Sequence, residues 1–204
     1  MKKEIIIMGA GGQTRSLVPI LNQNNFSIQG ILDDTFDPYK EEIICDTKLI
    51  GNINDYKFNI PVVLAIGDNI KRMQLFERFS SDILKDNLCH SNAFIDPDAD
   101  IGNSNQIFGR CFINSKVTIG NNNIINTGSI LEHEVKIGSH NHISVGSILC
   151  GRVTIGDRCF IGAGAVVIDK LTVCSDVTIG ANSVVIDHIT EPGIYVGNPV
   201  RKVN

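Results

Sequence analysis

The sequence reads IGNSNQ IFGRCF INSKVT IGNNNI INTGSI LEHEVK IGSHNH ISVGSI LCGRVT IGDRCF over residues 101–160. Each block of six begins with isoleucine or leucine, and an aliphatic residue occupies every sixth position without interruption from Ile95 to Val185. A helix buries apolar residues with a period of about 3.6 and a strand with a period of about 2, so a period of six indicates a chain that coils around a triangular core. The stretch therefore predicts a hexapeptide-repeat β-helix.

Three hexads complete one coil of such a β-helix, so residues 18 positions apart are expected to stack roughly one strand spacing apart. The Ile-Gly pair supports this, because it recurs at positions 101, 119, 137 and 155. Asparagine, glycine, aspartate and serine crowd the second to fourth positions of the hexad, where a corner needs positive φ or a side chain that bonds its own backbone. The fifth position is often small and is expected inside the corner, as at Cys111, Ser129, Ser147, Cys159, Ala165 and Ser183.

The residues before position 90 follow a different pattern. Apolar runs at 4–8, 28–32 and 62–66 predict strands. Helical spacing predicts one helix over 13–24 and another after the third run, with Ile70, Met73, Phe76 and Phe79 on its apolar face. This alternation is typical of a parallel sheet with covering helices, at a length that suits half of a dinucleotide-binding fold. We therefore expect a Rossmann-like α/β domain over residues 1–90, the β-helix over 91–188 and a capping tail over 189–204.

Composition limits the classes of partner. The 204 residues carry a formal net charge of -4 and no blocks of lysine or arginine, which argues against nucleic acid as the main partner. No apolar run approaches the ~18 residues of a membrane span, so we expect no membrane partner and a cytoplasmic location. The six cysteines form no C-x-x-C pair, and we interpret them as reduced packing residues.

A glycine loop follows the first predicted strand. In Gly9-Ala10-Gly11-Gly12-Gln13, backbone N–H groups and the start of the next helix can hold a diphosphate. Position 14 is threonine instead of a third glycine, so a simple tight turn is the alternative reading. Asp33-Asp34 ends the second strand about 20 residues further on, where an acid reaches a ribose or base, and Gly67 ends the third strand. Because the carboxyl ends of parallel strands share one edge, we predict a nucleotide site, more suited to a nucleotide-sugar than to a nicotinamide cofactor.

A second group of residues lies within the repeats, at Glu132-His133-Glu134. His133 falls at a corner, where Glu134 can turn back and hydrogen-bond one imidazole nitrogen, leaving the other as a general base. Stacking by 18 residues places Ser115 on one side of His133 and Gly151 on the other. Gly151 leaves open space and a backbone N–H that suits an oxyanion. A surface histidine flanked by acids without catalytic function is the alternative.

His142 lies half a coil from His133. It can contact His133 only if another copy of the chain supplies it, so we expect an oligomer with sites between subunits. No histidine recurs at an 18-residue offset, and neither cysteine nor histidine shows zinc spacing, so we predict no metal site. This argues against a γ-type carbonic anhydrase, which is also a β-helix enzyme.

These motifs resemble those of bacterial sugar acetyltransferases, a family that includes sialic acid O-acetyltransferases and UDP-4-amino-sugar N-acetyltransferases. The resemblance spans the whole chain. It rests on the segments 7–13, 32–34, 65–69, 126–134 and 142–146, of which the Glu-His-Glu stretch is the most specific. It implies a left-handed parallel β-helix, a homotrimer, and acetyl-CoA bound in the groove between neighbouring helices.

The resemblance also implies roles for individual residues. His133 would be the general base, Glu134 would tune it, and His142 and Gly151 would lie near the thioester of acetyl-CoA. Ala163 and Ala181 would line the cofactor groove. The residues implied to contact the nucleotide-sugar are Gly11, Gly12, Gln13, Asp33, Asp34 and Gly67, and Asn126 is a further candidate for substrate binding. Many relatives carry histidine where this chain has Gln13, which affects the diphosphate contact.

We therefore expect an acetyl-CoA-dependent N-acetyltransferase that acts on a nucleotide-linked 4-amino-4,6-dideoxy sugar. Direct transfer is expected, with Ser115 as the one alternative nucleophile. The closest rival function is O-acetylation of sialic acid or another sugar hydroxyl. A non-catalytic nucleotide-sugar sensor or scaffold, and an NAD-dependent enzyme, are rivals from other classes.

Overall fold

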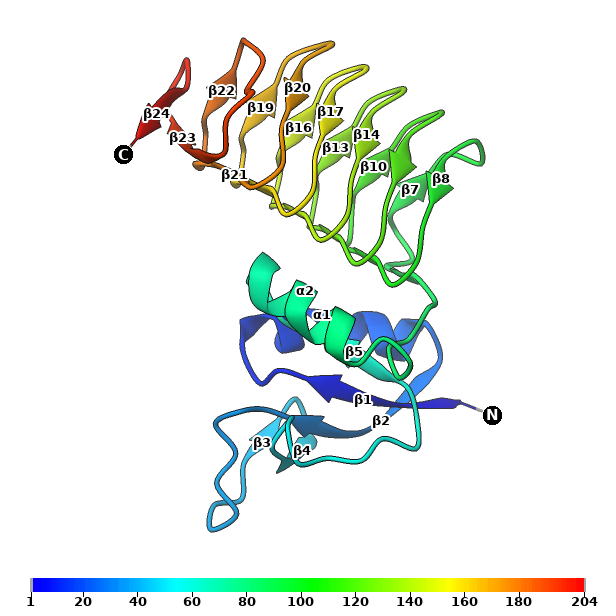
Figure 1. Cartoon of the computed structure of the whole chain (residues 1–204). Coiled ribbons are helices and arrows are strands. Elements are labelled where there is room, and N and C mark those ends of the chain that lie inside the picture. The colour runs from blue at the N-terminus through cyan, green and yellow to red at the C-terminus, as the bar shows by residue number, and fades with distance from the viewer. Residues whose placement is uncertain (1, 204) are drawn as a thin grey trace. The chain divides into compact units, whose positions relative to one another are not determined.

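The computed structural model describes residues 2–203, so the first residue of the predicted segment 1–90 and the last of the segment 189–204 lie outside it. The chain divides into two compact units, Met1–Leu88 and Cys89–Asn204. Figure 1 shows the α/β unit in blue to cyan and the coiled unit in green to red. An α/β unit followed by a left-handed parallel β-helix is the predicted fold class, which is confirmed. The boundaries at residues 90 and 188 stay predictions.

The α/β unit contains one five-stranded sheet in the order β3-β4-β2-β1-β5. Its elements are β1 (Lys3–Met8), α1 (Gly12–Gln23), β2 (Phe26–Leu32), β3 (Ile43–Ile44), β4 (Thr47–Gly51), β5 (Val62–Leu64) and α2 (Asn69–Arg78). All neighbouring strands pair in parallel except β3 and β4, which form an antiparallel hairpin. The residues from Ile5 to Met8 are fully buried, as expected of a central strand covered on both faces.

The structure corrects the predicted apolar face of α2. Ile70 is 44% exposed, and the buried residues of the helix are Asn69, Arg72 and Leu75. Met73, Phe76 and Phe79 are half-buried. The Arg72 guanidinium donates to the carbonyl oxygens of Ile66 and Gly67 and to Asn69 Oδ1, so a charged side chain that the apolar spacing did not include is fully buried.

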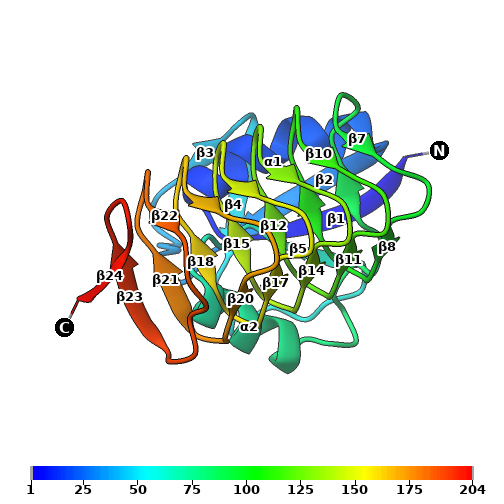
Figure 2. The same ribbon diagram turned by 90° about the horizontal axis from the view of Figure 1, so that it is seen from above.

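The second unit is a β-helix made of three stacked sheets. The first contains β7 (Phe94–Ile95), β10 (Phe112–Ile113), β13 (Ile130–Leu131), β16 (Ile148–Leu149), β19 (Val166–Val167) and β22 (Val184–Val185). The second contains β8 (Asp100–Ile101), β11 (Thr118–Ile119), β14 (Lys136–Ile137), β17 (Thr154–Ile155) and β20 (Thr172–Val173), which Figure 2 shows side by side. The third contains β6 (Leu88–Cys89), β9 (Gln106–Ile107), β12 (Ile124–Ile125), β15 (His142–Ile143), β18 (Phe160–Ile161), β21 (Val177–Ile179), β23 (Gly193–Val196) and β24 (Arg201–Val203).

The stacking interval of 18 residues is confirmed by the register of the strands. Ile113 pairs with Leu131, which pairs with Leu149, and the other two sheets repeat this offset. The aliphatic residue of every hexad from Ile107 to Val185 points into the prism and is at most 4% exposed. Ile95 and Ile101, in the first coil, are half-buried. The hexad therefore supplies one continuous apolar core.

The corners need left-handed backbone at one fixed position. The fourth residue of each hexad has positive φ without exception from Ser104 (φ 60°) to Asn182 (φ 55°). Only three of these positions hold glycine, whereas several hold arginine, lysine or glutamate. The prediction that corners need positive φ is therefore right, but turn-forming residue types mark only some of them.

The tail after residue 188 extends the third sheet. β23 pairs in parallel with β21, and β24 returns antiparallel to β23. These two strands lie at the C-terminal end of the stack of coils (Figure 1).

Candidate active site

His133 and Glu134 occupy the corner that follows β13. Glu134 takes the left-handed conformation (φ 61°), which turns its side chain back so that Oε2 lies 3.2 Å from His133 Nδ1. The two side chains are 48% and 50% exposed. A carboxylate at Nδ1 orients the imidazole and favours a proton on that nitrogen, which leaves Nε2 as the basic nitrogen.

Gly151 lies against the imidazole, one coil further along the same corner. The Arg152 N–H donates to the His133 carbonyl at 2.9 Å, which fixes this register. A Cβ atom at position 151 would lie 2.7 Å from both Cε1 and Nε2 of His133. The imidazole therefore occupies space that any residue other than glycine would need.

The backbone N–H of Gly151 is a spare donor. Gly151 is buried, and its carbonyl accepts from the Lys170 N–H at 2.9 Å. No acceptor within residues 2–203 receives its N–H. A buried N–H without an acceptor is unusual in a folded protein, and beside a basic nitrogen it suits an anion that forms during a reaction.

Asp169 continues this column on the far side of Gly151. Its Oδ1 lies 3.0 Å from where a Gly151 Cβ would be, and its carboxylate bonds to Arg152 Nη2 at 3.3 and 3.2 Å. Slight burial raises the pKa of Asp169, but the bond and the charge of Arg152 outweigh it and hold that pKa below its ordinary value. The carboxylate is thus kept ionised and paired.

His142 and Asn126 lie on a different part of the prism. His142 faces outward from β15 in the third sheet, and Asn126 begins the corner that follows β12 of that sheet. Asn126 Oδ1 accepts from the Thr127 N–H at 2.8 Å, which directs Nδ2 toward His142 Nε2 at 3.1 Å. His142 Nε2 therefore acts as an acceptor, and the neutral ring carries its proton on Nδ1. The Phe160 ring packs edge-on against the imidazole at 5.1 Å.

Ala163 and Ala181 stack on the corner that also carries Asn126. The Asn182 N–H donates to the Ala163 carbonyl at 2.8 Å, and both alanines are exposed. One chain thus divides the predicted residues between two corners on either side of the sheet that contains β13. His133, Glu134 and Gly151 lie on one corner, whereas Asn126, Ala163 and Ala181 lie on the other.

The α/β unit brings most of the predicted nucleotide-sugar residues to one cavity of about 360 Å³. Its lining comes from the ends of three parallel strands and includes Gly11, Gly12, Gln13, Asp33 and Gly67. α1 begins at this cavity with no side-chain cap on its N–H groups and no acid in its first turn. These features leave room for an anion at the start of the helix.

Asp33 is fully engaged inside this cavity. Its Oδ2 accepts from the Ala10 N–H at 2.8 Å, and its Oδ1 accepts from the Thr35 N–H at 3.0 Å and Oγ1 at 2.7 Å. Burial raises the pKa of Asp33, but these bonds together outweigh it and hold the pKa below the ordinary value of 3.8. The ionised Asp33 carboxylate therefore serves first to hold the glycine loop in place.

Asp34 does not line the cavity. Its Oδ2 bonds to Lys71 Nζ at 2.8 Å, and Lys71 does line it. The sequence reasoning missed Lys71. Its position in the sequence could have indicated it, because Lys71 lies three residues after Asp68, the N-cap of α2. A cation in the first turn of a helix is disfavoured by the helix dipole, so an anionic partner is expected nearby.

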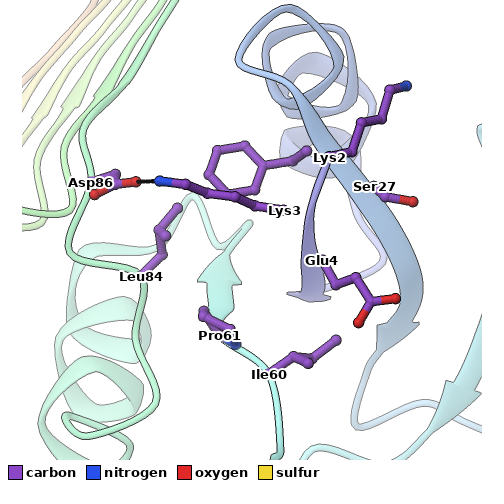
Figure 3. A pocket seen from close by; sticks show the side chains of 9 residues that line it. Lys2, Lys3, Glu4, Ser27, Ile60, Pro61, Leu84 and Asp86 are labelled. Atoms are coloured by element: carbon purple, nitrogen blue, oxygen red, sulfur yellow. Dashed lines mark hydrogen bonds and ion pairs between the residues drawn. The ribbon is translucent and has the colours of Figure 1, made fainter.

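A larger cavity of about 760 Å³ lies elsewhere in this unit, by the first residues of β1 and β2. Figure 3 shows Lys3 reaching across it to Asp86, at 2.9 Å, above Leu84, Ile60 and Pro61. Ligands of parallel α/β sheets bind at the carboxyl ends of the strands, and this cavity lies at the opposite ends. We therefore assign the nucleotide site to the smaller cavity.

The described part of the chain, residues 2–203, forms neither a metal site nor a membrane-spanning helix. Within residues 2–203, no three histidine, cysteine, aspartate or glutamate side chains come together to hold a metal ion. In the same range, no helix has both the length and the apolar character needed to span a bilayer. The cytoplasmic location stays a prediction.

Two family models match the chain. The PglD N-terminal domain matches residues 4–79, and the bacterial transferase hexapeptide (six repeats) matches residues 134–169. A search of curated proteins found no match. The resemblance to sugar acetyltransferases is confirmed, because the chain combines a PglD N-terminal domain with the hexapeptide repeats of bacterial transferases.

Solved structures repeat this arrangement over the whole chain. PerB from Caulobacter crescentus, in complex with CoA and GDP-perosamine, is 26% identical, with a TM-score of 0.88 over 98% of this chain and 97% of its own. The acetyltransferase domain of PglB from Neisseria gonorrhoeae, in complex with acetyl coenzyme A, is 24% identical, with a TM-score of 0.88 over 100% of both chains. WeeI from Acinetobacter baumannii is 17% identical, with a TM-score of 0.71 over 99% of this chain and 100% of its own.

Proposed function

We propose that the protein transfers the acetyl group of acetyl-CoA to the amino group of a nucleotide-linked 4-amino-4,6-dideoxy sugar. One observation carries this proposal. The imidazole of His133 is held at Nδ1 by Glu134 and lies on Gly151, whose buried N–H has no acceptor within residues 2–203. The CoA and GDP-perosamine bound to PerB support the choice of acetyl donor and of an amino sugar as acceptor.

His133 acts as the general base in this mechanism. The sugar amine attacks the thioester carbonyl, and His133 Nε2 takes a proton from the nitrogen as the N–C bond forms. Glu134 stabilises the imidazolium through Nδ1. The tetrahedral oxyanion accepts a hydrogen bond from the Gly151 N–H, and the C–S bond then breaks and releases CoA as a thiolate.

Transfer is direct in our proposal. Ser115 is the nearest candidate for an acylated nucleophile, one coil before His133. Its backbone N–H bonds to Asn114 Oδ1 and its carbonyl to the Glu134 N–H, so its backbone is part of the corner. A single transfer step within a complex of both substrates needs no such nucleophile.

The complete site is proposed to form between copies of the chain. The outward residues of the first sheet are all apolar and at least partly exposed, namely Phe94, Phe112, Ile130, Ile148, Val166 and Val184. Those of the second sheet are Asp100, Thr118, Lys136, Thr154 and Thr172. Phe94 and Phe112 stack at 4.8 Å on the first sheet and are 49% and 37% exposed. An apolar face of this kind is typical of an association surface.

A homotrimer with these faces toward its threefold axis would join the two halves of the site. The face that contains β13 is flanked by the His133 corner on one side and by the Asn126 corner on the other. Around a closed threefold axis, unlike corners of neighbouring copies meet. His142, Ala163 and Ala181 of one copy would then face His133 and Gly151 of the next, and acetyl-CoA would lie in the groove between them.

The cavity of the α/β unit is proposed to hold the nucleotide diphosphate of the acceptor. Its glycine loop and the uncapped start of α1 suit the diphosphate. Gly67 and Asp33 of the lining, together with Asp34 just outside it, would border the nucleoside. The sugar then extends away from this edge of the sheet.

The proposal is tested by supplying acetyl-CoA with UDP-, dTDP- and GDP-linked 4-amino-4,6-dideoxy sugars and measuring acetylated product by mass. We expect N-acetylation of at least one of the three, and His133→Ala should abolish it. Acetylation of sialic acid in place of all three amino sugars would favour O-acetylation. Binding without turnover would favour a sensor, and NADH binding to the glycine loop would favour a redox enzyme.

A further inference from the structure

We propose that Lys71 binds the diphosphate of the nucleotide-sugar. To do so, its Nζ would break the ion pair with Asp34, and the Asp34 carboxylate would then be available to the nucleoside. This inference rests on the proposed function, because it concerns the cavity assigned there to the diphosphate. It adds a residue that the glycine loop alone does not provide.

The charges around the cavity favour a cation beside a bound diphosphate. Asp33 is held ionised by Ala10 and Thr35, and Asp34 follows it directly in the chain. A diphosphate adds further negative charge to the same edge of the sheet. Among the described residues that line the cavity, Lys71 alone carries a positive charge.

Lys71 is fixed at its base and free to move at its tip. Its backbone N–H bonds to Asp68 Oδ1 at 2.7 Å, which anchors it in the first turn of α2. Its side chain is 46% exposed, and that of Asp34 is 42% exposed. An ion pair so open to water contributes little net stability, so Nζ can exchange one anion for another on its flexible stem.

The helix position argues for such an exchange. The positive charge of a lysine in the first turn interacts unfavourably with the dipole of α2. The Asp34 carboxylate offsets this in the absence of ligand, and phosphate oxygens would offset it in the complex. Arg15 is a poorer candidate, because its Nη1 already donates to the Gly11 carbonyl at 3.1 Å and it does not line the cavity.

The test is calorimetric binding of UDP, dTDP and GDP, together with the corresponding monophosphates, to the full chain. For Lys71→Gln we expect at least about a tenfold loss of affinity for the diphosphate that binds wild type, and a smaller loss for its monophosphate. Lys71→Arg should retain most of the affinity. Asp34→Asn should weaken the diphosphate and the monophosphate alike, because Asp34 is assigned to the nucleoside.

Lys48→Gln is the matched control, since it breaks the exposed Lys48–Glu41 ion pair of the same unit, 2.7 Å long, away from the cavity. It should leave all affinities unchanged. If wild type binds a diphosphate and Lys71→Gln binds it equally well, the role of Lys71 is overturned while the proposed function stands. If wild type binds none of the three diphosphates, both are overturned.

Discussion

One imidazole stands between a carboxylate and an unpaired backbone donor in this protein. Glu134 holds His133 Nδ1, and Gly151 leaves space and an N–H beside Nε2. Both contacts of the imidazole depend on the backbone of the corner. The positive φ of Glu134 brings its carboxylate to Nδ1, and the absence of a Cβ atom at Gly151 makes room for the ring. These local features yield separate predictions for each residue.

His133→Ala should lower kcat by at least about 100-fold, because it removes the base. Glu134→Gln should cause a smaller loss, within about tenfold, because glutamine can still orient the ring but does not stabilise its charge. Steady-state rates with saturating acetyl-CoA measure both effects. Wild-type kcat in His133→Ala would show that the imidazole is not the base.

Gly151→Ala should lower kcat strongly while the chain stays folded. Position 151 is not in the left-handed region, so the backbone accepts an added methyl group without strain. That group would lie 2.7 Å from Cε1 and Nε2 of His133 and 3.0 Å from Asp169 Oδ1, so the imidazole is the side chain displaced most. Circular dichroism checks the fold, and the rate reports the displacement of the ring. Unchanged kcat would mean that the position of the imidazole over Gly151 does not matter.

Asp33 should make the stability of the α/β unit sensitive to acid. Its pKa in the folded chain lies below the ordinary 3.8, so its contribution is complete above that value and is lost as the pH falls through the lowered pKa. Asp33→Asn should therefore flatten the fall in unfolding free energy between about pH 5 and pH 3, measured by urea titration. Asp46→Asn, on the exposed β3–β4 turn, should keep the wild-type slope. Equal slopes in all three proteins would contradict this assignment.

At the scale of the elements, the repeat is regular in backbone but not in residue type. The fourth residue of each hexad is left-handed whether it is Gly146 (φ 64°) or Lys116 (φ 58°). The left-handed conformation raises the free energy of the folded chain at every such residue that has a Cβ atom.

Gly146→Ala should lower the unfolding free energy by about 1–2 kcal/mol from backbone strain, because nothing lies within 4 Å of its added Cβ. Lys116→Gly should act in the opposite direction at an equivalent corner, by up to about 1 kcal/mol. Thermal or chemical unfolding measures both. Stabilisation by Gly146→Ala would rule out strain as the cost.

The apolar face of the first sheet should hold the copies together. Ile148→Lys places a charge in that face and should dissociate the trimer, since a buried unpaired charge is costly. Thr154→Lys, on the outward side of the adjacent strand β17, is the matched control and should leave the trimer intact. Light scattering after size-exclusion chromatography measures the mass. A trimer that survives Ile148→Lys would move the interface elsewhere.

The helices and strands differ in how well the sequence pattern predicted them. The β-helix was predictable because each of its hexads repeats one local rule. The β3–β4 hairpin was not predicted, since its strands are short and Ile43 is exposed. The predicted face of α2 was wrong at Ile70, which is exposed, whereas Phe76 and Phe79 pack against the core. The burial of Arg72 was not predictable, because its guanidinium bonds to carbonyl groups that only the folded loop presents.

At the scale of the whole molecule, the candidate site was predictable where it depended on the repeat. The contact of His133 with Glu134 and the stacking on Gly151 follow from counting hexads. Lys71 was missed because its pairing with Asp34 joins residues 37 positions apart, through the placement of α2 beside the end of β2. The two corners that carry the predicted residues are separate within one chain, so the proposed site requires association of neighbouring copies.

Mixing two inactive variants tests this union most directly. His133→Ala and His142→Ala, each purified alone, should be nearly inactive. After the two are unfolded and refolded together, about a quarter of the sites in random trimers should combine an intact His133 from one copy with an intact His142 from its neighbour. We predict that acetyltransferase activity returns to that fraction of the wild-type rate. Mixed trimers that stay as inactive as the separate variants would contradict a site shared between copies.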